Sequence, residues 1–306
     1  MNTPSIAEYA AGRTGRVVRC LALAAVLLAG LLLALPGFAQ DKPDDNAVWK
    51  AFIDWFKSAP LGGDAFSAYA AKLEQEGVPR TEVERRLAAI TRLFSERPEG
   101  VEVYYDRAFS KPLTGNPALD GPSAPSDFVV ETAKGLKPGT ALDLGTGRGR
   151  NAVYLAGQGW DVTGMDISQA GLNAAKESAA KAGVLIKTVK ADYGSFDFGT
   201  EQWDLIVMEF AWAPVADPAF VAKIEKSLRP GGIVLFEHFV DDPKHPSYAP
   251  MIRAVETSAL RDYFPGFEIL SFDERERTAD WGGPGSRIVR LLARKKSRAP
   301  ASLLGE

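Results

Sequence analysis

From residue 126 onward, short apolar runs alternate with segments of helical pattern, and this alternation limits the possible folds more than any other feature. Short buried strands separated by helices are typical of a mostly parallel sheet with helices on both faces. We therefore predict a doubly wound α/β domain with a seven-stranded sheet. Its strands are expected at residues 141–144, 161–165, 184–190, 203–208, 233–237, 267–272 and 287–293.

Capping residues mark where the helices between these strands begin. Ser126, Ser168 and the pair Asp217-Pro218 each precede a helical pattern and predict helices to residues 136, 183 and 228. Further helices are expected at residues 150–158 and 251–263, and the Pro-Gly-Gly run at 230–232 is expected to form a turn.

The chain in front of this domain has a different pattern. Trp49, Phe52 and Phe56 lie on one helical stripe, and residues 46–97 are helical with breaks at 62–63 and 77–79. This predicts a helical segment at 40–110, either a packed subdomain or a lid over a substrate; a membrane-surface helix is a further alternative. Residues 110–126 read as a loop. We expect the α/β domain to span 111–298 and a tail to span 299–306.

Residues 1–39 resemble a targeting segment rather than part of the fold. Arg13, Arg16 and Arg19 precede 16 apolar residues, and Ala39 ends a small-x-small pattern. This predicts a secretory signal peptide that is cut after Ala39, with an uncleaved membrane anchor as the alternative. Sixteen helical residues reach only about 24 Å, short of the roughly 30 Å hydrocarbon core. The protein is thus expected to be exported or anchored, touching the membrane only through this segment.

Composition narrows the class of partner. The 306 residues carry a formal charge of −3 and contain one Cys and two His. Loss of residues 1–39 removes three Arg, one Glu and the Cys, so the charge becomes −5 and no thiol remains. Nucleic acid is not expected as a partner, because no strongly basic surface is available. A thiolate-rich zinc or iron–sulfur site is excluded.

A glycine-rich turn follows the first predicted strand. Gly145, Gly147 and Gly149 alternate there, directly before a helix, and a dinucleotide fingerprint would need its third glycine at the position of Arg150. Glycines permit a tight turn and close approach of a ligand to the backbone, although an ordinary structural turn has the same sequence. Asp143 would repel a pyrophosphate and attract a cation, which predicts a positively charged ligand.

Two stretches carry a family resemblance. LDLGTGRGRNAVYLA at 142–156 resembles motif I of the class I S-adenosylmethionine-dependent methyltransferases, and GWDVTGMDIS at 159–168 resembles their second-strand motif. The helix that follows the glycine turn, at 150–156, also resembles that of the tellurite-resistance and thiopurine type of small-molecule methyltransferase. The resemblance covers residues 126–294 and implies S-adenosylmethionine as cofactor and a small molecule as methyl acceptor. Thr146 replaces a frequent Cys, and the front segment has no counterpart.

The resemblance also implies a set of cofactor contacts. The three glycines would pass along the methionine part, Asp143 would contact its ammonium group, and Asp166 would accept both ribose hydroxyls. As alternatives, Asp166 would only cap a helix and Asp192 would only form a turn. The full set implied is Asp143, Gly145, Thr146, Gly147, Gly149, Asn151, Asp166, Ile167, Asp192, Tyr193 and Glu209.

Tyr104 and Tyr105 resemble the family's aromatics over the cofactor, with core packing as the alternative. Glu209 and Phe210 fall where such enzymes hold the acceptor.

No catalytic residue is assigned from the sequence. Methyl transfer is an in-line displacement that requires alignment, and a base is needed only if the acceptor keeps a proton until reaction. His238, Glu237 and Glu209 are the candidate bases. His238 and His245, with two Asp between them, form only a weak metal pattern, and no metal site is predicted.

Two other functions stay open at this stage. They are a nicotinamide-dependent oxidoreductase and a noncatalytic nucleoside-binding scaffold of the same fold. No Asn-Pro-Pro-Tyr-type run follows the fourth strand, which argues against amino methylation of DNA bases. The predicted export also conflicts with the use of S-adenosylmethionine, because this cofactor is made inside cells.

No oligomeric state is predicted.

Overall fold

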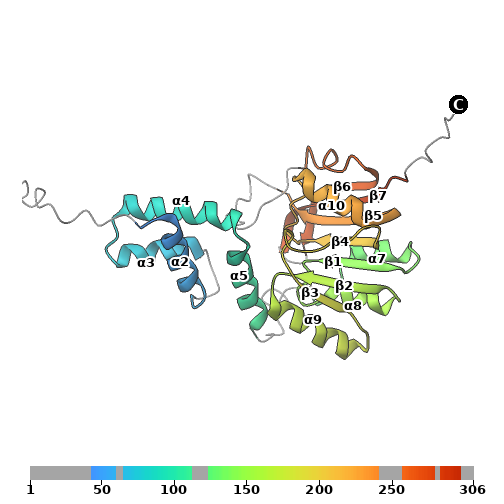
Figure 1. The fold of residues 1–306 in the computed structure, drawn as a ribbon, viewed down its shortest axis with the longest axis horizontal. Coiled ribbons are helices and arrows are strands. Elements are labelled where there is room, and N and C mark those ends of the chain that lie inside the picture. The colour runs from blue at the N-terminus through green and yellow to red at the C-terminus, as the bar shows by residue number, and fades with distance from the viewer. Residues whose placement is uncertain (1–42, 60–64, 112–122, 241–256, 280–282, 298–306) are drawn as a thin grey trace, which may run out of the picture. The chain divides into compact units, whose positions relative to one another are not determined.

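A computed structural model describes residues 43–59, 65–111, 123–240, 257–279 and 283–297. Its centre is a seven-stranded sheet in the order β3-β2-β1-β4-β5-β7-β6 (Figure 1). The strands are β1 (Thr140–Leu144), β2 (Asp161–Asp166), β3 (Lys187–Lys190), β4 (Trp203–Glu209), β5 (Leu228–Phe239), β6 (Phe267–Ala279) and β7 (Gly283–Lys295). The predicted doubly wound, mostly parallel seven-stranded sheet is confirmed.

The strand order places the site. Strands β1 to β5 pair in parallel, and only β7 runs antiparallel, between β5 and β6. Strand order reverses between β1 and β4, which are neighbours in the sheet. In open α/β sheets, ligands bind outside the carboxyl ends of the strands at such a point.

Within the described residues, four helices belong to this sheet domain: α7 (Asp127–Lys134), α8 (Arg150–Gly157), α9 (Gln169–Ala182) and α10 (Pro218–Ser227). Three of them begin at the predicted caps, because the side chains of Ser126, Ser168 and Asp217 accept N–H groups of the first turn. Gly183 ends α9 in the left-handed conformation, as glycine does at many helix ends.

Alternate residues of the strands bury against opposite faces of the sheet. Leu142 and Leu144 pack in one core with side chains of α10, whereas Ala141 packs in a second core with side chains of α7 and α8. Both faces are therefore covered, and the central strands read as continuous apolar runs for this reason.

Several predicted element limits need correction. Strand β5 begins at Leu228 rather than at 233, and the Pro-Gly-Gly run is a register irregularity inside it instead of a separate turn. The predicted helix at 251–263 is wrong for residues 257–263, which are bends and turns; the remainder lies outside the described residues. Strands β6 and β7 form a longer hairpin than expected, because charged outer residues continue the pairing beyond the apolar runs.

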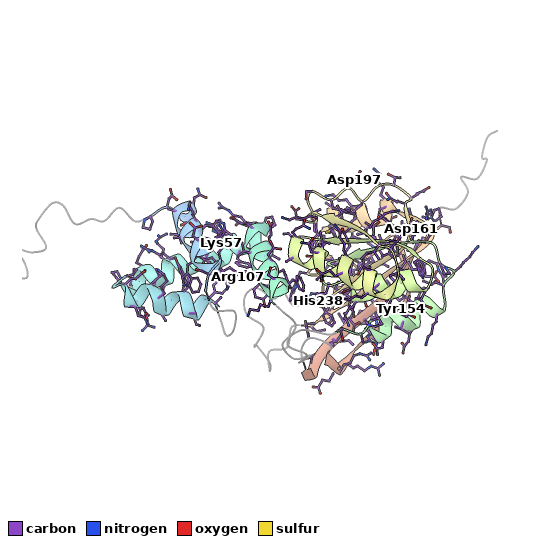
Figure 2. The ribbon with its side chains drawn as sticks, turned by 90° about the horizontal axis from the view of Figure 1, so that it is seen from below. Lys57, Arg107, Tyr154, Asp161, Asp197 and His238 are labelled. Atoms are coloured by element: carbon purple, nitrogen blue, oxygen red, sulfur yellow. The ribbon has the colours of Figure 1, made fainter. Side chains whose placement is uncertain are left out.

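The front segment forms helices α2 (Asp45–Phe56), α3 (Ala65–Gln75), α4 (Arg80–Glu96) and α5 (Pro98–Ser110). The aromatic stripe of α2 packs in a core of its own with α3 and α4. Helix α5 lies inside the predicted helical segment at 40–110 but beyond the helical pattern at 46–97, and Pro98 stands at its first turn, where proline favours a helix start. Arg107 on α5, labelled in Figure 2, donates to the carbonyl of Phe56 at the end of α2 and to that of Ala59 beyond it.

None of the helices in the described ranges combines the length and apolarity that a membrane span requires. The predicted targeting segment at 1–39 and the tail at 299–306 lie outside the described residues.

Candidate active site

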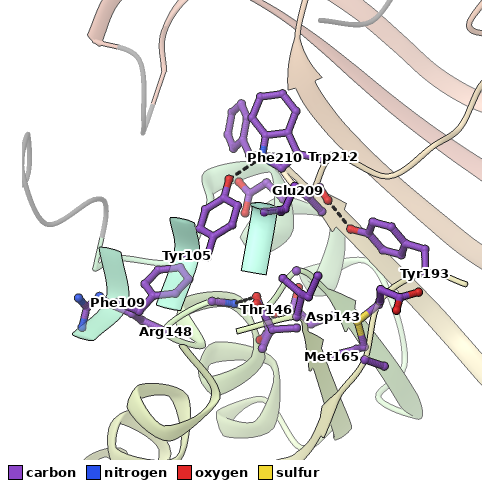
Figure 3. A pocket seen from close by; sticks show the side chains of 18 of the residues that line it. Tyr105, Phe109, Asp143, Thr146, Arg148, Met165, Tyr193, Glu209, Phe210 and Trp212 are labelled. Atoms are coloured by element: carbon purple, nitrogen blue, oxygen red, sulfur yellow. Dashed lines mark hydrogen bonds between the residues drawn. The ribbon is translucent and has the colours of Figure 1, made fainter. Parts of the chain in front are cut away.

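A cavity of about 420 Å³ lies where strands β1, β2 and β4 end (Figure 3). It is lined by ten of the eleven predicted cofactor residues, all except Gly149. The rest of the lining comes mainly from α5, from the glycine turn and the start of α8, and from the segment after β4, with single residues of β2 and β5 and one after β3: Pro98, Val101, Tyr104, Tyr105, Phe109, Arg148, Arg150, Met165, Ala191, Phe210, Ala211, Trp212 and Phe239.

The three glycines of the turn have positive φ, between +52° and +82°. A Cβ on Gly145 would come within 2.9 Å of Ala211, one on Gly147 within 3.1 Å of Phe109, and one on Gly149 within 2.8 Å of Ala175 on α9. These positions thus need glycine for the turn and for close packing of neighbouring segments. The expectation that the missing Cβ atoms face a ligand is corrected, most clearly for Gly149, which lies outside the cavity lining.

Asp143 lies at the buried end of the cavity. Its side chain is only 3% exposed and accepts a hydrogen bond of 2.7 Å from the hydroxyl of Thr146. Burial raises the pKa of Asp143 to about 7, and the nearby Glu209 carboxylate adds to the rise, while the Thr146 hydrogen bond opposes it. A cation in the cavity would favour the ionised carboxylate and be bound by it.

Asp166 ends β2 and holds the glycine turn in place. Its two carboxylate oxygens each accept one backbone N–H, from Gly147 at 2.8 Å and from Ser168 at 2.8 Å. Burial raises the pKa of Asp166. Each carboxylate oxygen has a second lone pair, so the two backbone contacts leave acceptor capacity for the predicted sugar contact.

Asp192 and Tyr193 both line the cavity but are engaged differently. The Asp192 carboxylate accepts the N–H groups of Gly194 at 2.6 Å and Ser195 at 3.0 Å. These two hydrogen bonds form the turn that is the alternative role of Asp192. The hydroxyl of Tyr193 donates to the carbonyl of Ala211 and so ties the segment after β3 to the segment after β4.

Glu209 ends β4 and is held by two partners. Arg150 forms an ion pair with its Oε1 at 2.9 Å, and the amide of Asn151 donates to its Oε2. Glu209 is 8% exposed and Asn151 is 5% exposed. Asn151 lines the cavity, but its side-chain hydrogen bonds run to protein groups, so the structure shows it orienting Glu209.

Aromatic side chains gather at the β4 end of the cavity. Phe210 and Trp212 have φ of +49° and +55°, a conformation that bulky residues rarely adopt and that concentrates at functional sites. The indole of Trp212 donates to the hydroxyl of Tyr105 at 2.6 Å (Figure 3). Burial raises the pKa of Tyr105. The cavity therefore has an acidic end at the glycine turn and an aromatic end after β4.

Two of the three candidate bases lie outside the cavity lining. Glu237 accepts hydrogen bonds from Arg290 and Ser126, and His238 is 1% exposed and packs against Trp212 and Phe236 (Figure 2). Burial lowers the pKa of His238 to about 4, which keeps its ring neutral near pH 7. Of the three, only Glu209 faces the cavity.

Helix α5 supplies functional residues that the sequence reasoning largely missed. Phe109 packs on Gly147 and on Gly171 of α9. The guanidinium carbon of Arg148 lies over the Phe109 ring, 5.4 Å from the ring centroid. Asp106 accepts from the hydroxyl of Ser168 at 2.6 Å and from the N–H of Ala170 at 3.1 Å, so it docks α5 on the start of α9. The spacing of Tyr105 and Phe109, four residues apart on one helix face, is the signal that could have indicated this wall.

The charge of the lining fits a cationic ligand. Four carboxylates, those of Asp143, Asp166, Asp192 and Glu209, face the cavity with two guanidinium groups, those of Arg148 and Arg150. S-adenosylmethionine carries a sulfonium and an ammonium group, so both its charge and its sugar find matching groups here. Among the described residues no group of His, Cys, Asp or Glu side chains is arranged to hold a metal ion. His245 and the two preceding Asp lie outside these residues.

Comparisons with known proteins agree with this geometry. A family profile described as "Methyltransferase domain" matches residues 141–232. Over 176 residues the chain is 27% identical to the probable S-adenosyl-L-methionine-dependent methyltransferase TehB of Haemophilus influenzae and 28% identical to Hemagglutinin 1 of Eikenella corrodens. Each match covers 55% of this chain, but only 61% and 58% of those relatives.

A solved structure shows the same fold. The crystal structure of TehB from Haemophilus influenzae superposes with a TM-score of 0.50 and 24% identity, covering 64% of this chain and 67% of that one. The residues matched by the family profile include the glycine turn and Asp166 at the end of β2. Residues 141–232 therefore match a methyltransferase domain, and the comparisons support the predicted resemblance to the class I S-adenosylmethionine-dependent methyltransferases.

Proposed function

We propose that this protein transfers a methyl group from S-adenosylmethionine to a small-molecule acceptor. The observation that carries the proposal is a single cavity with an acidic end at the glycine turn and an aromatic end after β4. The first end suits a cationic cofactor, and the second suits an apolar or planar acceptor. A cavity of about 420 Å³ is within the usual range for small-molecule sites.

The residues around the cavity would act by binding and alignment. S-adenosylmethionine, when bound, supplies a methyl group that is already activated. Asp143 and Asp166 would fix the charged and sugar ends, while Tyr105 and Trp212 would bound the acceptor and exclude water. Alignment in a site closed to water is the main requirement of an in-line displacement.

The small-molecule acceptor is favoured by charge and by enclosure. Residues of α5 form one side of the cavity, and the chain as a whole carries a formal charge of −3. A nucleic-acid acceptor would instead favour a basic surface.

Calorimetric titration tests which cofactor the protein binds. We expect S-adenosylmethionine and its demethylated product S-adenosylhomocysteine to bind with one site per chain, and NAD not to bind. Preference for NAD would favour the oxidoreductase instead. Binding of S-adenosylmethionine without methyl transfer to any member of a broad acceptor panel, followed with labelled cofactor, would favour the noncatalytic scaffold.

A matched pair of β2 variants sharpens the titration. Asp166→Asn keeps the shape of the side chain but removes its charge, and loss of a charged hydrogen-bond acceptor should weaken cofactor binding by about 10- to 100-fold. Asp161→Asn is the control, since Asp161 starts the same strand and pairs with Lys187 at the surface. Equal affinities of the two variants would exclude Asp166 from the cofactor site.

A further inference from the structure

A buried hydrogen-bond chain begins at Arg290, on strand β7 and outside the cavity lining. The guanidinium Nε of Arg290 donates to Oε1 of Glu237 at 2.9 Å, and the hydroxyl of Ser126 donates to Oε2 of the same carboxylate at 3.3 Å. Arg290 thus has a direct contact with Glu237, and Glu237 is in turn fixed by a residue at the start of α7.

The chain continues from Ser126 to the cavity. The backbone N–H of Ser126 donates to Oδ1 of Asn151 at 3.0 Å, and Nδ2 of Asn151 donates to Oε2 of Glu209. Asn151 meets a donor at one end and an acceptor at the other, so its amide orientation is fixed. The other oxygen of Glu209 is paired with Arg150 at 2.9 Å.

All the inner members of this chain are buried. Ser126 is 1% exposed, Glu237 3%, Asn151 5% and Glu209 8%. Hydrogen bonds in such a low-dielectric setting are strong, and removal of one partner leaves another buried polar group unsatisfied. A change at Arg290 can therefore be transmitted to Glu209 through contacts that have no solvent alternative.

We propose that Arg290 is a positioning residue for Glu209, acting through the relay Arg290–Glu237–Ser126–Asn151–Glu209, and that this relay directs the Glu209 carboxylate toward the sulfonium of the cofactor. The proposal rests on the proposed function, because it takes S-adenosylmethionine as the occupant of the cavity. Glu209 stands beside Phe210 and Tyr105 at the end of the cavity that receives the acceptor (Figure 3).

The relay would make the site bind a ligand with a positively charged sulfur more tightly than one with a neutral sulfur. S-adenosylmethionine carries a positive sulfur, whereas the sulfur of S-adenosylhomocysteine is neutral, and the two molecules are otherwise alike apart from the methyl group. A fixed carboxylate near the sulfur stabilises the first more than the second. S-adenosylhomocysteine would then bind more weakly than S-adenosylmethionine, so the reacted cofactor would dissociate more readily than the unreacted one.

The test is the ratio of the dissociation constants for S-adenosylhomocysteine and S-adenosylmethionine, measured by calorimetry on the full chain. Arg290→Met should lower this ratio by about fivefold, the scale of coupling within one hydrogen-bond network. Arg294→Met, four residues further along β7, removes only an exposed pair with Glu268 and should leave the ratio unchanged. A merely structural role of Arg290 would weaken both ligands equally and would overturn the proposal.

Two further variants exclude loss of folding as the cause. Glu237→Gln keeps the shape of the relay and should lower the ratio in the same direction. Arg290 also pairs with Asp127, so Asp127→Asn removes that contact alone and should not change the ratio. Thermal melting of each variant shows whether it is folded.

A double variant tests whether the effect passes through Glu209. In a Glu209→Gln background, Arg290→Met should change the ratio no further, because the charge that the relay positions is absent. A persisting effect would overturn the proposal. If the unchanged protein binds neither ligand, the proposed function fails; if it binds both and the ratio does not respond to Arg290, only the relay fails.

Discussion

At the scale of the residue, Asp143 shows how burial and function act on one group. Its carboxyl group has a pKa raised to about 7 by burial, and Thr146, Arg150, Asp166 and Glu209 are the polar and charged groups that act on it. Such a carboxyl titrates near neutral pH, where an exposed Asp would be fully ionised. The charge at the acidic end of the cavity therefore depends on pH and on whether a cation is bound.

We predict that affinity for S-adenosylmethionine rises between pH 5.5 and pH 7 and levels off above it. The cation binds the ionised carboxylate, and protonation of Asp143 below its pKa of about 7 removes that charge. Calorimetry across this range should show the rise in the unchanged protein and a smaller slope in Asp143→Asn. An identical slope in the variant would show that another group controls binding.

The raised pKa of Asp143 also makes the ligand-free protein less stable as the pH rises. A carboxyl whose folded pKa is above its unfolded value of 3.8 holds its proton longer in the folded state, so stability is lost as pH rises from about 4 to 7. The loss from this one group is at most about 4 kcal/mol, at 1.36 kcal/mol per unit. Asp143→Asn should flatten this part of the curve in urea unfolding.

Gly145 and Gly183 form a matched pair for testing the glycine turn. Both have φ of +70°, but a Cβ on Gly145 would meet Ala211 at 2.9 Å, whereas a Cβ on Gly183 would meet nothing within 4 Å. Gly183→Ala should lower the free energy of unfolding by about 1 to 2 kcal/mol, the cost of the left-handed conformation alone. Gly145→Ala should lower it further and should also weaken cofactor binding, since Ala211 lines the cavity. Equal losses in the two variants would contradict the packing role.

At the scale of the element, α5 completes a cavity that the sheet domain leaves open on one side. Five of its residues line the cavity, and its position depends on polar contacts with α9 and on the packing of Phe109 against Gly147. Tyr104 on α5 also packs with the aromatic core of the front helices. The cavity thus includes a helix from the segment that the sequence assigned to a separate helical region.

We predict that Asp106→Ala loosens α5. The carboxylate accepts two hydrogen bonds at the start of α9, and their loss should speed amide exchange in α5 and raise the dissociation rate of S-adenosylmethionine by about tenfold. Glu102→Ala is the control, because the exposed ion pair of Glu102 with Lys190 contributes little. Unchanged exchange in the Asp106 variant would show that α5 is held by other contacts.

At the scale of the whole molecule, the chain has separate cores with different roles. The front helices bury an aromatic cluster around Phe52, and the sheet domain has apolar cores on its two faces.

We propose that residues 1–39 are an export signal, on the basis of the Arg residues, the 16-residue apolar run and the small-x-small exit at Ala39. Mass spectrometry of the protein from its native host should find a mature chain that begins at Gln40. Recovery of the uncut chain from the membrane fraction would favour the anchor, and recovery from the cytosol would exclude export.

The sequence by itself determined the sheet domain and the chemistry of the residues at the carboxyl ends of its strands. Alternating strands and helices, three capping residues and the Gly-x-Gly-x-Gly turn are local patterns, so they predict local structure and the carboxyl ends where Asp166 and Glu209 lie. The roles of Glu237 and His238 could not be predicted, because burial and partners from other strands decide them. The docking of α5, the partners of the three glycines and the relay from Arg290 rest on contacts between residues up to 111 positions apart. Such contacts exist only once the chain has folded, and therefore only the tertiary structure decided them.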